Sequence, residues 1–157
     1  MKKILYLVAA LPLLASVCFT SCKSDEPDST VKELLIGTWK IDKEDVVIYK
    51  NGEVTSRITE DYTEAQESGV LNTMTFNSDG TFKMVLKENG VKDDVTEANW
   101  NLQDDKTIIV SNSTSPELVK WEIKTLDSKN LTIFYLRESE YDGVQYKYET
   151  TGYCTKL

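Results

Sequence analysis

Apolar and polar residues alternate with a period of two along most of the chain between residues 38 and 151, which is the pattern of strands that bury one face. The alternating segments are short, and most are separated by turns of hairpin length. Asn51-Gly52, Asp79-Gly80 and Asn89-Gly90 are the clearest turns, because both residues of each pair accept the positive φ of a tight hairpin. We therefore expect an all-β domain of eight to ten short strands.

The limits of the individual elements follow from where the alternation starts and stops. Thr30 and Glu33 have the spacing of a capping box, so we expect a short helix over residues 31–36 that ends at Gly37. Residues 59–68 predict a short helix or a loop across one mouth of the domain, and residues 137–143 predict a charged loop. The alternating segments from which these strands are built are 38–42, 46–50, 53–58, the two arms of the hairpin 72–86, 91–98, 99–102, 107–110, 118–126, 130–136 and 144–151.

Strands this regular, each with one polar face, favour an antiparallel up-and-down meander that closes into a β-barrel, since closure removes unpaired edges. A β-sandwich of two sheets is the alternative. The expected inward faces are rich in bulky side chains: Trp39, Ile41, Met74, Phe76, Phe82, Met84, Leu86, Trp100, Leu102, Ile108, Val110, Val119, Trp121, Ile123, Leu131, Ile133, Tyr135, Val144, Tyr146 and Tyr148.

An interior of this composition is either packed for much of its length or holds a cavity near one mouth. Methionine adapts its shape to a ligand, and a phenol offers a polar tip on an apolar body. If there is a cavity, the candidate ligand-binding residues are Met74, Met84, Trp121, Tyr135, Tyr146 and Tyr148.

The N-terminus has the pattern of a targeting segment, which we expect to be separate from the folded domain. Lys2 and Lys3 are followed by an apolar run over residues 4–14, which is too short and too interrupted for a resident membrane span. The segment ends in a sequence that resembles a bacterial lipobox, so we expect residues 1–21 to be a lipoprotein signal peptide and Cys22 to be lipidated, as by palmitate. Cys18 is the rival acceptor, and an ordinary secretory signal is the alternative.

Residues 22–30 are polar, acidic and contain a proline, which predicts a flexible tether before a domain over residues 31–157. This stretch resembles the acidic signal that sends some lipoproteins to the outer face of the outer membrane. We expect a membrane partner through the lipid anchor, with cell-surface exposure or, alternatively, a periplasm-facing anchor.

Charge and composition exclude several functions. The chain has 18 basic and 26 acidic residues and no basic cluster, which disfavours nucleic acid as a partner. It has no histidine, so histidine-based catalytic triads and the commonest metal ligand are absent. The carboxylate groups at Asp93-Asp94, Asp104-Asp105 and 138–142 are expected in solvated turns. We therefore expect no enzyme activity, no cofactor and no metal site.

Four segments together resemble the bacterial lipocalin-like domain of surface lipoproteins. In the first, Gly37 stands two residues before Trp39 at the start of a strand, where the glycine would allow a sharp turn and the indole would close one end of the barrel. The other three are residues 75–82, 99–102 and 121–133.

The resemblance implies a small antiparallel barrel that binds a small apolar molecule, and it carries over no ligand residues. The second hypothesis is a packed barrel that acts as a non-enzymatic interaction or accessory module of the envelope. Its unknown protein partner would contact residues 59–69 and 137–143.

Overall fold

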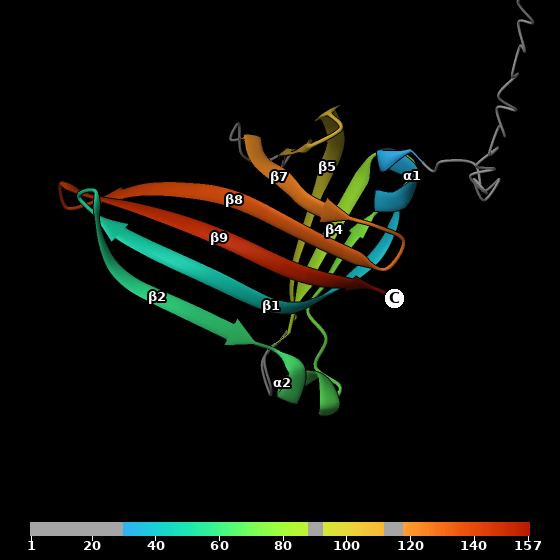
Figure 1. Cartoon of the computed structure of the whole chain (residues 1–157), viewed down its shortest axis with the longest axis horizontal. Helices are drawn as coiled ribbons and strands as arrows, with labels where there is room; N and C mark the ends of the chain where they lie inside the picture. Colours follow the sequence, from blue (N-terminus) through green and yellow to red (C-terminus); the bar gives the residue numbers. More distant parts are fainter. Residues whose placement is uncertain (1–29, 88–92, 112–117) are drawn as a thin grey trace, which may run out of the picture.

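The structure, a computed structural model, describes residues 30–87, 93–111 and 118–157. Within these ranges the chain forms nine strands and two short helices (Figure 1). In chain order they are α1 (Val31–Leu35), β1 (Gly37–Lys50), β2 (Glu53–Asp61), α2 (Thr63–Glu67), β3 (Thr73–Phe76), β4 (Thr81–Leu86), β5 (Asp94–Asp104), β6 (Thr107–Ser111), β7 (Leu118–Leu126), β8 (Asn130–Tyr141) and β9 (Val144–Lys156).

Eight of the strands close into an antiparallel barrel. Each strand from β3 to β8 pairs with the next one along the chain, and β1 closes the ring by pairing with β3 on one side and β9 on the other. This confirms the expected all-β, up-and-down barrel, the architecture that lipocalins use, rather than the two-sheet sandwich.

The remaining strand, β2, lies outside the ring. It pairs with the far half of β1, between Lys43 and Lys50, while β8 and β9 run alongside past the end of the barrel. The result is a four-stranded sheet in the order β2-β1-β9-β8, formed by residues 43–61 and 136–151, which projects from the barrel (Figure 1). We refer to it as the extension.

The strands of the extension are longer than the sequence pattern predicts. The expectation of a charged loop at residues 137–143 is wrong. Strand β8 continues to Tyr141, and Asp142 and Gly143, with φ of 52° and 74°, make a two-residue turn into β9. Most side chains here are at least partly exposed on both faces of the sheet, so apolar alternation no longer marks the strand.

Other boundaries also shift. The strands expected at 38–42 and 46–50 are one strand, β1, and those at 91–98 and 99–102 are joined in β5. The non-strand segment expected from residue 59 begins later, because β2 runs to Asp61 before α2. The Asn51-Gly52 turn is confirmed, with φ of 49° and 86°, whereas Asn89-Gly90 lies outside the described residues.

Helix α1 covers one end of the barrel. Its capping box is present, because Glu33 Oε2 accepts from the Thr30 backbone N–H at 2.8 Å and Thr30 Oγ1 accepts from the Glu33 N–H at 3.3 Å. Leu35 at its end is fully buried, and Trp39 beside it donates its indole N–H to the Leu35 carbonyl at 2.8 Å. The helix thus brings its last residue onto the ring of Trp39.

A contiguous core lies inside the barrel. Its buried members are Leu35, Trp39, Ile41, Met74, Phe76, Phe82, Trp100, Ile108, Val110, Trp121, Ile123, Leu131, Ile133 and Cys154. Of these, Phe76 packs edge-on against Trp100, with ring centroids 5.2 Å apart. The largest fully buried side chains include Leu35 and Trp39, at the end of the barrel that α1 covers.

Candidate functional site

A bulge in β1 decides which of its side chains face the interior. The register between β1 and β9 shifts between Ile41 and Lys43, so Asp42 is the extra residue. Before the bulge, the odd-numbered Trp39 and Ile41 point inward. After it the parity changes, and Glu44 lies opposite Gly152 on the inner face. A carboxylate is thereby placed inside the barrel wall.

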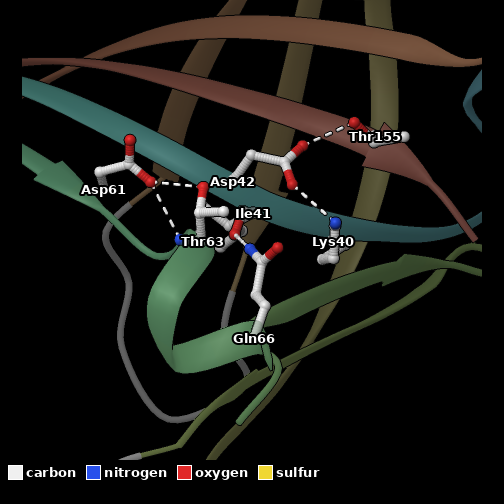
Figure 2. Close-up of polar contacts among 7 residues, drawn as sticks. All are labelled: Lys40, Ile41, Asp42, Asp61, Thr63, Gln66 and Thr155. Carbon is white, nitrogen blue, oxygen red and sulfur yellow. Dashed lines mark hydrogen bonds and ion pairs between the residues drawn. The ribbon is translucent and has the colours of Figure 1, made fainter. Parts of the chain in front are cut away.

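The bulge is held by a set of polar contacts (Figure 2). Asp42 accepts from the Thr155 hydroxyl at 2.6 Å and forms an ion pair with Lys40 at 2.9 Å. From α2, the Gln66 side chain donates to the Ile41 carbonyl at 2.9 Å. The backbone N–H of Tyr62 donates to the Asp42 carbonyl at 2.9 Å. These contacts fix α2 against the strand where Glu44 enters the interior.

Two phenols converge on Glu44. The Tyr62 hydroxyl lies 2.9 Å from Glu44 Oε2 and 2.7 Å from Oε2 of Glu60, the cross-strand partner of Glu44. The Tyr135 hydroxyl donates to Glu44 Oε1 at 3.3 Å. Burial, strengthened by the Glu44 charge, raises the pKa of Tyr135 to about 12 and also raises the pKa of Tyr62. Both phenols are therefore neutral donors at physiological pH.

A cavity of about 1030 Å³ opens beside this cluster. Its inner wall is largely apolar, with the carboxylate of Glu44 among thioether, aromatic and aliphatic groups. The lining residues that lie on the inner face of the barrel are Ile41, Glu44, Met74, Met84, Val119, Trp121, Ile133, Tyr135, Arg137, Gly152 and Cys154. The absence of a side chain at Gly152, opposite Glu44, adds to the open space.

The cavity reaches solvent through the barrel wall. The ladder between β7 and β8 begins at the pair Trp121–Tyr135, so residues 118–120 and 136–138 are not paired with each other. All six of these residues line the cavity, and Leu118, Val119 and Leu136 are exposed apolar side chains among them. We call this gap the portal. Its rim consists of three apolar residues, Leu118, Val119 and Leu136, and three charged residues, Lys120, Arg137 and Glu138.

Trp121 stands at the inner edge of the portal. Its ring contacts those of Phe82 and Tyr135, with centroids 5.4 Å and 5.9 Å away. The side chain is 6% exposed, and its indole N–H finds no hydrogen-bond acceptor among the described residues. Among the described residues, this nitrogen is the only buried side-chain nitrogen or oxygen without a hydrogen-bond partner.

The structure separates the candidate ligand residues into two groups. Met74, Met84, Trp121 and Tyr135 all line the cavity. Tyr146 and Tyr148 do not; they lie on β9 in the extension, stacked on each other with centroids 6.5 Å apart. The proposed barrel-closing residues lie at the other end, where Trp39 is fully buried and Gly37 has a φ of 133°.

Sequence reasoning missed Glu44, Tyr62 and Arg137. The change of apolar positions from odd numbers at Trp39 and Ile41 to even numbers at Val46 and Ile48 was the available signal for the bulge, and hence for Glu44. Tyr62 reaches the site only through the packing of α2, which no local pattern encodes.

Cys154 lines the cavity, but burial raises the pKa of its thiol to about 12, with the charges of Asp42 and Glu44 adding to the effect, so it is a poor nucleophile. Within residues 30–87, 93–111 and 118–157, no group of three metal-ligating side chains comes together. Neither described helix is long and apolar enough to cross a membrane.

Comparison with known proteins finds similarity in structure only. No protein-family model matches the chain, and no curated protein matches it in sequence. A lipocalin-like protein from Bacteroides uniformis is 15% identical, covering 78% of this chain and 98% of its own, with a TM-score of 0.46. Bovine odorant binding protein complexed with its natural ligand is 19% identical, covering 85% and 77%, with a TM-score of 0.45. Similarities this distant leave the fold assignment to rest on the strand pairing itself.

Proposed function

We propose that this chain is a non-enzymatic binding protein whose barrel takes up a small apolar ligand through the portal. The observation that carries the proposal is the cavity of about 1030 Å³, since ligand sites in proteins are concave, mostly apolar and of this order of size. Met74 and Met84 pair across β3 and β4 and supply adaptable apolar surface on the inner wall.

The proposal is tested by titrating the protein with the neutral fluorescent probe N-phenylnaphthylamine. Met84→Trp replaces a flexible thioether with a bulky indole ring that fills part of the cavity, and we expect it to weaken probe binding by roughly tenfold or more. Lys83→Trp is the matched control, because Lys83 is the neighbouring residue on β4 and points to the outer face. Binding that is absent in the unaltered protein, or equal in both variants, would overturn the proposal.

We further propose that the barrel is tethered to the outer membrane by lipid on Cys22 and displayed on the cell surface, with a periplasm-facing anchor as the alternative. Support comes from the basic and apolar residues 2–14, the lipobox-like ending and the acidic tether over 22–30. Cells that express the chain should incorporate an alkyne analogue of palmitate into it. Cys22→Ser should abolish the label and Cys18→Ser should retain it; the reverse result would move the acceptor to Cys18.

A second candidate function is a protein-interaction module of the envelope, and the extension favours it. Ile58, Leu136 and Tyr141 are exposed apolar residues on this sheet, and β2 pairs along one edge only within the described residues. Failure of the unaltered protein to bind apolar probes would leave this candidate as the preferred one.

A further inference from the structure

The carboxylate of Glu44 lies over a gap in the inner wall of the cavity. A Cβ atom added at Gly152, which stands opposite Glu44 on β9, would lie 4.0 Å from Glu44 Oε1 and 3.4 Å from Ile133 Cγ1. All three residues line the cavity, and the Glu44 side chain is only partly buried. Oxygen Oε1 therefore stands beside the open space that the glycine leaves.

The contacts of Glu44 leave its negative charge without a cationic partner. Oxygen Oε1 accepts a hydrogen bond from Tyr135 at 3.3 Å, and each carboxylate oxygen has room for a second donor. On the other side, the Tyr62 hydroxyl is close to both Glu44 and Glu60, but a phenol has one proton and donates to one of them at a time. None of the ion pairs formed among the described residues includes Glu44.

The charge of Glu44 acts on other groups of the lining. Burial raises the pKa of Tyr135 to about 12, and the Glu44 charge adds more to this effect than the Arg137 charge offsets. Burial also raises the pKa of the Cys154 thiol to about 12, and the charges of Asp42 and Glu44 add to that effect. The potential is thus negative at two places in the cavity lining, whereas Arg137 is exposed at the portal, where water and salt screen its charge.

We infer that the cavity selects an apolar molecule that carries an ammonium group, such as an alkyl or aryl amine, and that Glu44 accepts a hydrogen bond from that group. This rests on the proposed function, because it names the ligand class that the same cavity accepts. Hydrogen bonds between charged groups are the stronger ones, and the rings of Trp121 and Tyr135 in the lining attract a cation. An anionic ligand would meet the charge of Glu44 after losing its own hydration.

Three naphthalene probes of similar size test the inference at neutral pH: naphthylmethylamine, which is cationic, ethylnaphthalene, which is neutral, and naphthoate, which is anionic. Affinities come from displacement of N-phenylnaphthylamine. We expect the unaltered protein to prefer naphthylmethylamine to ethylnaphthalene by roughly tenfold, the equivalent of one hydrogen bond to a charged group. Naphthoate should bind most weakly. Equal affinity for the amine and the ethyl compound, or tightest binding of naphthoate, overturns the inference while the proposed function stands.

Two variants assign the preference to Glu44. Glu44→Gln removes the charge at nearly constant shape and should bring the ratio of amine to ethyl affinity close to one. The ratio is measured within each variant, so a general loss of affinity cancels. Glu140→Gln is the matched control, because Glu140 lies on β8 in the extension and does not line the cavity, so its ratio should equal that of the unaltered protein. A ratio that survives Glu44→Gln, or falls equally in both variants, overturns the assignment.

The side-chain carboxyl carbon signal of Glu44 in a ¹³C NMR spectrum provides a readout that needs no variant. It should move when naphthylmethylamine is added and stay in place with ethylnaphthalene, and equal shifts contradict the inference. If the unaltered protein binds neither N-phenylnaphthylamine nor any of the three probes, the proposed function and the inference are both overturned, which is a different outcome from a missing preference.

Discussion

Trp39 is the residue at which helix, strand and core meet. Its ring is fully buried, its N–H bonds to the last residue of α1, and Lys156 Nζ lies 5.0 Å from the ring centroid. The same lysine donates to the Leu34 carbonyl at 2.6 Å, so the C-terminal end of the chain also converges here. One side chain thus ties both ends of the domain to the closed end of the barrel.

We expect Trp39→Phe to lower the free energy of unfolding by about 1–3 kcal/mol beyond the loss of ring volume, because the buried Leu35 carbonyl loses its donor. Urea unfolding followed by circular dichroism measures this. Trp121→Phe is the comparison, since it removes a similar volume and no hydrogen bond made within the described residues. An equal loss of stability in the two variants would show that the Trp39 hydrogen bond contributes little.

The sequence predicts which face of a strand a side chain occupies more reliably where the strand is regular than where it contains a bulge. Trp39, Phe76 and Trp100 lie in the core as their alternation indicates. Glu44 could not be placed by simple alternation, because the extra residue at Asp42 reverses the faces of β1 beyond it. The four cavity residues anticipated from sequence lie on strands without such a shift before them.

At the scale of elements, three of the hairpin turns are stabilised by the same kind of hydrogen bond. Asp79, Asp104 and Asp127 each accept a hydrogen bond from the backbone N–H two residues later, at 2.9, 2.8 and 2.7 Å. These bonds lower the pKa of each carboxyl below its ordinary value of 3.8. Such turn chemistry was readable from the sequence, whereas the continuation of β8 to Tyr141 was not, since this part of the strand carries Arg137 on one face and Glu138 on the other.

The lowered pKa values make stability depend on pH in a defined direction. The folded state binds protons less readily at these aspartates than the unfolded chain, so their contribution is present above pH 4 and is lost as the pH falls through the folded pKa values. The urea midpoint should therefore fall between pH 5 and pH 3. Asp127→Asn should lower the midpoint at pH 7 and flatten this decline.

Asp105→Asn is the control for that experiment. Asp105 follows Asp104 in the same turn, but its carboxylate accepts no hydrogen bond from the described residues. Its substitution should leave the acid dependence unchanged. A decline that is as steep in Asp127→Asn as in the unaltered protein would remove the turn aspartates from the explanation.

The whole molecule combines a closed barrel with an open sheet. The barrel closes through the pairing of β1 with β3 and β9, while the extension buries little apolar surface and holds its outer face with the contacts among Tyr49, Lys147 and Glu149. The portal lies where β7 and β8 separate, so the site stands at the boundary between the two parts. The barrel and the extension should differ in local stability, because the free energy of local unfolding rises with the number of buried apolar contacts.

We expect hydrogen exchange to reveal two levels of protection. Amides of β2, which pairs on one side only and has eight of its nine residues exposed, should exchange roughly tenfold or more faster than those of β3, β4 and β6. The part of β8 beyond Tyr135 should behave like β2, since it lacks β7 as a partner. Mass spectrometry of peptic peptides measures both. Protection of β2 equal to that of β3 would mean that the extension and the barrel open as one cooperative unit, and the portal would then be as rigid as the core.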